Sequence, residues 1–187
     1  ELCGYSLRAL SDETMAFLED SQATYESLLA RRLEAAGIPR HQATNADVQW
    51  LVLGPRHEQL MSREALLPAA EKTLAALGVS LAGQRAIHLD LEQRPHKHDR
   101  PHCIPVSVPD EIRIVASPRG GCVDFLSFFH ELGHAQHAAH THPRLPCAYR
   151  LMGDDAVSEA FAFLFQALVL EEQWLREVIG AQQELSD

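Results

Sequence analysis

The sequence predicts a mainly α fold of the α+β class, in which a core of helices carries one small sheet. Helix-forming stretches bounded by capping residues, glycine and proline occupy most of the chain. Alternating apolar residues are confined to short segments between residues 86 and 115. A chain of 187 residues is also long enough to bury one hydrophobic core.

Three helices are expected in the N-terminal part of the chain. The first, residues 11–37, ends at a glycine with a proline beyond it. The second, residues 44–54, opens on a capping-box pattern. The third, residues 68–78, has a proline near its start and a glycine past its end. We therefore predict a helical segment over residues 1–80, packed on a core formed by residues 81–187.

Strands are expected at residues 86–91, 104–108 and 111–115, separated by an irregular loop region rich in proline. The last of these strands comes shortly before the helix described next. An exposed edge there could pair with an extended peptide through main-chain hydrogen bonds. The alternative is an ordinary strand with both of its edges occupied.

The strongest functional signal is the H-E-x-x-H motif formed by residues 130–134. Two imidazoles four positions apart are about 40° apart around a helix, so His130 and His134 can reach one metal ion. Glu131 then lies beside a water that the metal would hold. An apolar run, residues 123–129, predicts a buried helix that leads into this motif.

A second signal is Glu159, the one charged residue in the apolar stretch 156–170. Apolar residues on nearly every side predict a helix that is buried on all faces. A buried carboxylate must be neutral, paired with a cation or bound to a metal. We therefore expect His130, His134 and Glu159 to bind one Zn²⁺ per chain, with Glu131 as the general base in hydrolysis of peptides.

The histidines that follow the motif offer an alternative third ligand. His140 would be that ligand in the H-E-x-x-H-x-x-G-x-x-H pattern of metzincins, but this chain has His137 at the glycine position. If the helix continues, His140 lies about 280° from His130 and points away from the metal. His137 shares the face but lies about 10 Å along the axis, so we expect it to line the cleft or support a ligand.

Other residues near the motif have weaker candidate roles. Asp154 or Asp155, about one turn before Glu159, could orient a ligand imidazole by accepting its second N–H, although capping of a helix explains Asp154 equally well. Gly120 and Gly121 would form a flexible link before the motif helix and a place where substrate binds.

Tyr149, Cys103 and a histidine cluster complete the candidates. Tyr149 could donate to an oxyanion if the chain folds back, but a surface or core tyrosine is the simpler interpretation. We expect Cys103 to be structural rather than a nucleophile, because its neighbour His102 would point to the opposite face of an extended segment. The cluster of His96, His98 and His102 is expected to be a polar loop rather than a second metal site.

Composition excludes several functional classes. A net charge of −10 without a run of Lys or Arg disfavours a nucleic-acid partner. No uncharged apolar stretch reaches 18 residues, so we expect no membrane-spanning helix. The four cysteines are widely spaced, which favours free thiols and a cytoplasmic location.

Taken together, several segments resemble the thimet oligopeptidase and oligoendopeptidase F family of zinc peptidases, which are gluzincins (H-E-x-x-H with a downstream Glu). The resemblance covers roughly residues 85–170 and is carried by residues 90–97, 103–106, 111–121, the motif itself and 158–162. The 25 positions between His134 and Glu159 are similar to the spacing of that family's third ligand.

The resemblance implies a mostly helical zincin-like core around a channel that admits short peptides and excludes folded proteins. It also implies zinc binding by His130, His134 and Glu159, with Glu131 as the base. Family members are longer and supply a transition-state Tyr and His from a later segment, whereas none of the 28 residues after Glu159 is Tyr or His. We therefore expect a part of a longer peptidase, or alternatively a zinc-binding domain that is catalytically incomplete.

Overall fold

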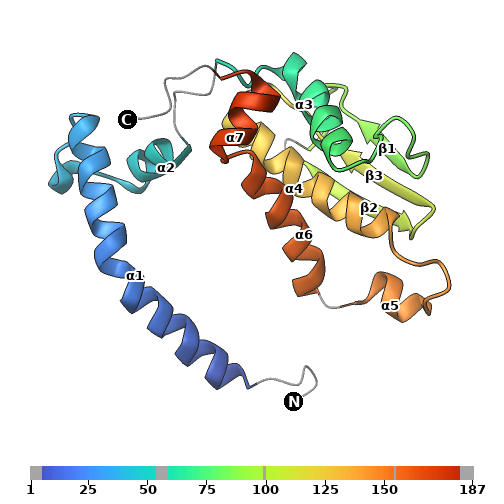
Figure 1. Cartoon of the computed structure of the whole chain (residues 1–187), viewed down its shortest axis with the longest axis horizontal. Helices are drawn as coiled ribbons and strands as arrows, with labels where there is room; N and C mark the ends of the chain where they lie inside the picture. The colour runs from blue at the N-terminus through green and yellow to red at the C-terminus, as the bar shows by residue number, and fades with distance from the viewer. Residues whose placement is uncertain (1–5, 54–58, 99, 154, 182–187) are drawn as a thin grey trace. The chain divides into compact units, whose positions relative to one another are not determined.

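The structure is a computed structural model that describes residues 6–53, 59–98, 100–153 and 155–181. It is mainly helical with a three-stranded sheet, which confirms the predicted fold class (Figure 1). The chain divides into two compact units, Glu1–Gly54 and Pro55–Asp187. In the described ranges no helix is both long enough and apolar enough to cross a membrane.

The first unit contains α1 (Leu7–Ala35), the short 3-10 helix η1 (Arg40–Gln42) and α2 (Asn45–Leu53). The first helix begins four positions earlier than predicted, because Ser6 rather than Ser11 caps it by accepting a hydrogen bond from the Ala9 N–H.

The capping box at the start of α2 is confirmed. The Thr44 N–H donates to Asp47 Oδ2 over 2.8 Å, and the Asp47 N–H donates to the Thr44 hydroxyl over 3.4 Å. The hydrogen bond that the Thr44 hydroxyl donates to Asp47 Oδ2, and secondly that of the Thr44 N–H, hold the pKa of Asp47 below its usual range. The predicted end of this helix at Gly54 and Pro55 lies outside the described residues.

The second unit is built on a sheet with strand order β1-β3-β2, formed by β1 (Ile87–Asp90), β2 (His102–Ser107) and β3 (Glu111–Val115). The central strand β3 is parallel to β1 and antiparallel to β2. Both edges of β3 are therefore occupied, so it is an ordinary inner strand and not the exposed edge that we considered for peptide binding. The two edge strands of the sheet are β1 and β2.

The proline-rich segment before β3 is more regular than predicted. Strand β2 begins at His102, before the predicted start at residue 104, and includes Pro105. Proline lacks the N–H that an inner strand needs, but an edge strand can place that position toward solvent.

A buried lysine closes the end of β1. The side chain of Lys97 is 3% exposed, and its Nζ donates to the carbonyls of Asp90, Glu92 and Ala116. The same ammonium contacts Asp90 Oδ1 at 2.9 Å, and Arg94 contacts both Asp90 carboxylate oxygens. These hydrogen bonds, from Arg94 first and then Lys97, hold the pKa of Asp90 far below its usual range. They anchor the loop from β1 to β2.

Helix α4 (Cys122–Ala139) packs between the sheet and α6 (Asp155–Leu168) (Figure 1). In β3 the buried Ile112 and Ile114 alternate with the exposed Arg113, as a half-buried strand requires. The side chains that fill this core are fully buried: Ile112, Ile114, Phe125, Phe128, Phe129 and Leu132.

Helix α3 (Arg63–Ala76) belongs to this second unit, whereas the predicted boundary near residue 80 assigned it to the N-terminal segment. It begins earlier than predicted because Ser62 caps it, so Pro68 lies inside the helix. The helix ends before Gly78, as predicted, and that glycine has φ of 76°. Its Thr73 hydroxyl accepts a 2.8 Å hydrogen bond from the indole N–H of Trp174.

Three short helices complete the unit: α5 (Cys147–Leu151), α7 (Glu172–Trp174) and the π-helix η3 (Leu175–Ile179). Trp174 on α7 also meets Phe129 edge to face, with ring centroids 5.3 Å apart. This contact ties the C-terminal helices to the helix that carries the motif.

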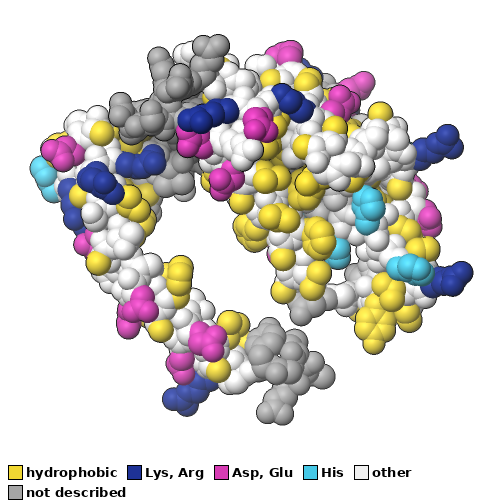
Figure 2. All heavy atoms as spheres, in the orientation of Figure 1, with side chains coloured by type: hydrophobic (Ala, Val, Ile, Leu, Met, Phe, Trp, Pro, Cys, Tyr) yellow, Lys and Arg dark blue, Asp and Glu magenta, His cyan; other side chains and the backbone are white. Residues whose placement is uncertain are grey.

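The prediction that residues 156–170 form a helix buried on all faces is wrong. Among the described residues of α6 only Ala162 and Phe165 are buried. Phe163 and Leu164 are 58% and 59% exposed, and hydrophobic side chains gather along this helix on the molecular surface (Figure 2). One side of α6 packs on α4, while Val157, Phe163 and Leu164 are each more than half exposed.

Candidate metal centre

The two motif histidines lie on one face of α4, as their spacing predicts. Their imidazole centroids are 4.8 Å apart and the rings are nearly perpendicular. Each side chain is 20% exposed. The opposite face of the helix buries Phe125, Phe129 and Leu132, which fixes the helix and so the two imidazoles.

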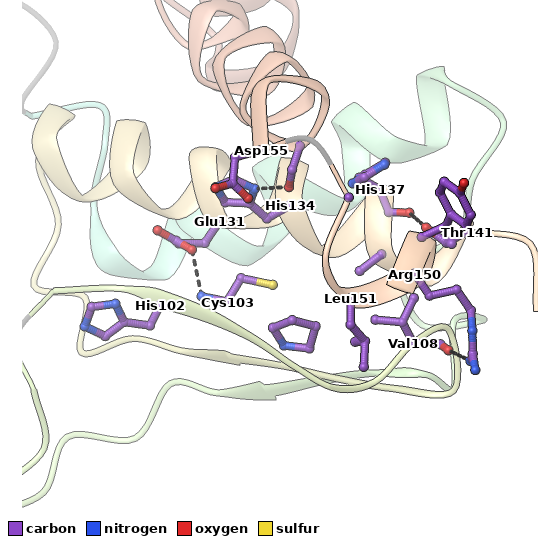
Figure 3. Close-up of a pocket in the computed structure, with 15 residues that line it drawn as sticks. His102, Cys103, Val108, Glu131, His134, His137, Thr141, Arg150, Leu151 and Asp155 are labelled. Carbon is purple, nitrogen blue, oxygen red and sulfur yellow. Dashed lines mark hydrogen bonds between the residues drawn. The ribbon is translucent and has the colours of Figure 1, made fainter. Parts of the chain in front are cut away.

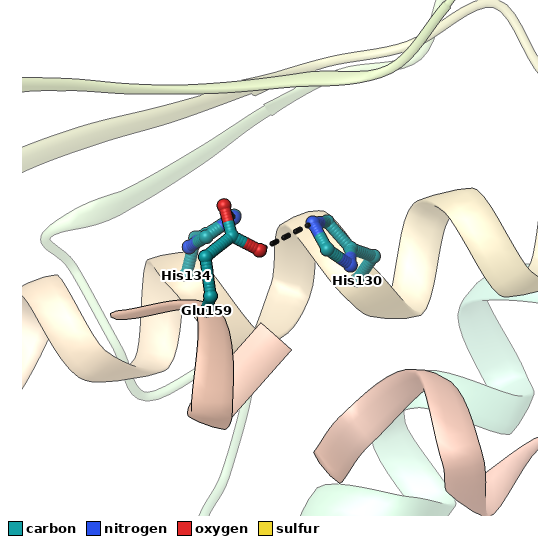
Figure 4. Close-up of side chains that lie close together, drawn as sticks. All are labelled: His130, His134 and Glu159. Atoms are coloured by element: carbon teal, nitrogen blue, oxygen red, sulfur yellow. Dashed lines mark ion pairs between the residues drawn. The ribbon is translucent and has the colours of Figure 1, made fainter. Parts of the chain in front are cut away.

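Glu159 on α6 joins these two histidines (Figure 4). Its Oε2 lies 3.5 Å from His130 Nε2, and its Oε1 lies 3.7 Å from His134 Nε2. The side chain is 46% exposed. The prediction that Glu159 is completely buried is therefore wrong, although the structure does bring this carboxylate to the two histidines.

The donor set fits a metal ion. One ligand atom from each of His130, His134 and Glu159 lies within 4.8 Å of the other two, and no other such group of three is found among the described residues. Ligands about 2.1 Å from a tetrahedral ion lie about 3.4 Å apart. The nitrogen–oxygen distances of 3.5 Å and 3.7 Å are close to that value. This group could hold a metal ion.

Two side chains from α6 orient the imidazoles. His130 Nδ1 lies 2.9 Å from Gln166 Oε1, and His134 Nδ1 lies 2.8 Å from Ser158 Oγ. When Nδ1 of each ring is protonated and bonded in this way, Nε2 keeps its lone pair for a metal. We predicted Asp154 or Asp155 for this role. The structure gives it to Ser158 and Gln166, both of which the sequence analysis missed.

Glu131 lines the same pocket as His134 and is not one of the three candidate ligands. Its Oε2 accepts a 2.7 Å hydrogen bond from the Cys103 backbone N–H on β2. The edge strand of the sheet therefore holds this carboxylate from the side opposite to α6. Because a local sequence pattern carries no information about a partner 28 positions away, this contact could not be predicted.

A pocket of about 310 Å³ opens beside Glu131 and His134 (Figure 3). Strand β2, the second half of α4, the helix α5 and the start of α6 form its walls. Its other lining residues are His102, Cys103, Pro105, Val108, His137, Ala138, Thr141, Tyr149, Arg150, Leu151, Gly153, Asp155 and Ser158.

Two titratable groups in this pocket are perturbed by their surroundings. Burial, and secondly the negative charge of Glu131, raises the pKa of the Cys103 thiol to about 12. Burial, with a smaller contribution from His134, lowers the pKa of His137. His137 also stacks on Phe161 with ring centroids 5.0 Å apart, so it lines the pocket as predicted. Cys103 is a protonated thiol at neutral pH, which fits a structural residue.

The remaining predicted residues lie in different places. Asp155 lines the pocket, is exposed, and appears beside His134 in Figure 3, whereas Asp154 lies outside the described residues. Gly120 and Gly121 do not line the pocket. Both have positive φ, and the Gly121 N–H donates to the Met61 carbonyl over 2.7 Å, so they form a turn against the start of α3.

His140, the alternative third ligand, does not belong to the group formed by His130, His134 and Glu159. His140 follows the last turn of α4, and its Nδ1 lies 2.8 Å from the Gln136 carbonyl oxygen. In the histidine cluster, His98 Nδ1 lies 3.1 Å from His102 Nε2, and His102 lines the pocket. Tyr149 is 71% exposed and also lines the pocket, so the chain does fold back at this point.

Comparisons of this chain with protein-family models, curated proteins and solved structures find no match.

Proposed function

We propose that this protein is a zinc-dependent peptidase that hydrolyses short peptides, similar in its chemistry to the thimet oligopeptidase and oligoendopeptidase F family. The observation that carries the proposal is the convergence of His130, His134 and Glu159, together with a separate carboxylate, Glu131, that lines a pocket beside His134. Two neutral imidazoles and one carboxylate are a ligand set typical of catalytic zinc sites.

His130, His134 and Glu159 would hold the ion. When bound, zinc supplies a Lewis acid that lowers the pKa of water and makes a carbonyl more electrophilic. The hydrogen bonds that the two Nδ1–H groups donate to Gln166 Oε1 and Ser158 Oγ keep both imidazoles in the orientation that such a site needs.

Glu131 acts as the general base. It accepts a proton from the attacking water, then transfers this proton to the nitrogen of the leaving amine. The Cys103 N–H holds one carboxylate oxygen in place and leaves the other oxygen for the water. A zinc site with only a structural role would have no need of this residue, so the position of Glu131 favours an enzyme over a catalytically incomplete zinc-binding domain.

The experiment that tests the proposal combines elemental analysis of the purified protein with cleavage of a quenched-fluorescence peptide library. We expect one zinc per chain and cleavage that Glu131→Gln abolishes while zinc remains bound. Zinc without cleavage would contradict the peptidase and favour a metal-binding domain. Absence of bound zinc, or equal cleavage by the Glu131→Gln protein, would contradict the whole assignment.

A further inference from the structure

The far end of the pocket carries an arginine that the proposed mechanism does not use. Arg150 lies on α5 and lines the pocket. One of its terminal nitrogens donates to the Val108 carbonyl. Its Nε is buried and has no hydrogen-bond partner among the residues that the structure describes. No described carboxylate forms an ion pair with this guanidinium.

An arginine in this state is suited to binding an anion. The guanidinium carries five N–H donors in a planar fork and stays charged at every physiological pH. Because Nε is buried and one terminal nitrogen already bonds Val108, a carboxylate in the pocket would pair with the other terminal nitrogen through a charge-assisted hydrogen bond. The two acidic residues of the lining, Glu131 and Asp155, lie near His134 and away from Arg150 (Figure 3).

The distance between the two ends of the pocket suits a short piece of peptide. Glu131 and Arg150 lie at opposite ends in Figure 3. The pocket extends from Glu131 at least to Ala138, seven positions along α4, which is about 10 Å of helix. An extended peptide advances about 3.3–3.6 Å per residue, so about three residues span this length. Val108 and Leu151 line the same end and provide an apolar wall for side chains.

We propose that Arg150 binds the C-terminal carboxylate of the peptide substrate, so that the pocket receives about the last three residues and the bond before them is cleaved near Glu131. This inference rests on the proposed peptidase function. It names a substrate class, short peptides with a free C-terminus, and a specificity-determining residue outside the metal centre.

The test measures binding separately from turnover. An N-acetylated hexapeptide of alanine and leucine is titrated into Glu131→Gln protein by calorimetry, as the free acid and as the C-terminal amide. We expect the acid to bind at least about tenfold more tightly, because a hydrogen-bonded ion pair is worth more than a neutral contact. Adding Arg150→Gln should lower the affinity for the acid to that for the amide and leave the amide unchanged. Unchanged amide binding also shows that the pocket is still folded.

Two further variants sharpen the test. Arg144→Gln removes an exposed arginine close by in the chain that does not line the pocket, and should keep the full preference for the acid. Arg150→Lys keeps the charge without the fork and should keep part of that preference. Equal affinities for acid and amide, an acid preference that survives Arg150→Gln, or no measurable binding of either peptide would overturn the inference.

Cleavage of the same two peptides by the unsubstituted chain separates the two proposals. Release of a C-terminal tripeptide from the acid, with little cleavage of the amide, supports both. Equal cleavage of acid and amide contradicts the role of Arg150 and leaves the peptidase standing. Acid-selective binding without any cleavage contradicts the peptidase and leaves the carboxylate site standing.

Discussion

Gly133 on α4 lies directly against the backbone of Phe161 on α6. A methyl group at Gly133 would lie 2.5 Å from the Phe161 carbonyl oxygen and 2.6 Å from Ala162 Cα, much closer than van der Waals contact. The two helices can therefore approach only because the residue before His134 is glycine. Glu159 is carried by α6, so this close approach brings it within reach of both histidines.

Gly133→Ala is expected to push the two helices apart and to weaken metal binding. Both atoms that the added methyl meets belong to backbone, so a rotamer change cannot relieve the overlap. We expect a loss of about 1–3 kcal/mol in the free energy of unfolding, typical of overpacking. Zinc affinity should fall at least about tenfold, as it does when ligand orientation is disturbed. Chemical denaturation and titration against a chelator of known affinity measure the two effects.

Gly83→Ala provides a matched control for this substitution. There the added carbon would lie 3.3 Å from the Ser80 hydroxyl oxygen, which belongs to a movable side chain. We expect little change in stability and none in zinc affinity. If Gly133→Ala behaves like Gly83→Ala, the close packing of α4 on α6 is not what positions Glu159.

Glu159→Ala and His140→Ala distinguish the two candidate third ligands. Loss of Glu159 leaves two imidazoles, so we expect zinc affinity to fall more than a hundredfold, beyond the effect of residues outside the ligand set. His140→Ala should retain zinc at the affinity of the unsubstituted protein, because that side chain bonds to the Gln136 carbonyl. Competition with a chelator measures both. The reverse result would favour the metzincin-like alternative.

Much of this centre could be predicted from the sequence because it depends on local geometry. The periodicity of a helix places His130 and His134 together whatever surrounds them. Glu159 was identified for a reason that proved wrong, since its helix is only partly covered. The contacts that complete the site join distant positions, such as His134 with Ser158 and Glu131 with Cys103. They arise from the packing of α4 between α6 and β2, which no single segment encodes.

Ser158→Ala and Gln166→Leu test the orientation of the imidazoles. Each substitution removes the partner of one Nδ1 atom and keeps all three candidate ligands. We expect zinc affinity to fall about 10- to 100-fold in each variant, with little change in the unfolding temperature of the metal-free protein. Ser107→Ala, at the exposed end of β2, is the control and should leave affinity unchanged. Equal affinities in all four proteins would mean that Ser158 and Gln166 do not orient the histidines.

Thiol reactivity tests the contact between β2 and the motif helix. Burial and the charge of Glu131 raise the pKa of Cys103 to about 12, and a raised pKa disfavours the thiolate, which is the reactive form. At pH 9 only about one Cys103 side chain in a thousand would be ionised. Iodoacetamide should therefore label the exposed Cys147 well before Cys103, and the rate at Cys103 should rise about tenfold for each pH unit between 8 and 10. Peptide mass spectrometry measures both rates.

Glu131→Gln then separates the two causes of the shift in Cys103. Removing the negative charge lowers the pKa of the thiol, so labelling at a given pH should become faster. Burial is the larger cause and is unchanged, so the rate should stay far below that of the unfolded protein. A rate at Cys103 that levels off below pH 9 would show that the thiol is unperturbed. The same rate with and without the charge would show that Glu131 does not lie against β2, and the position proposed for the general base would then be wrong.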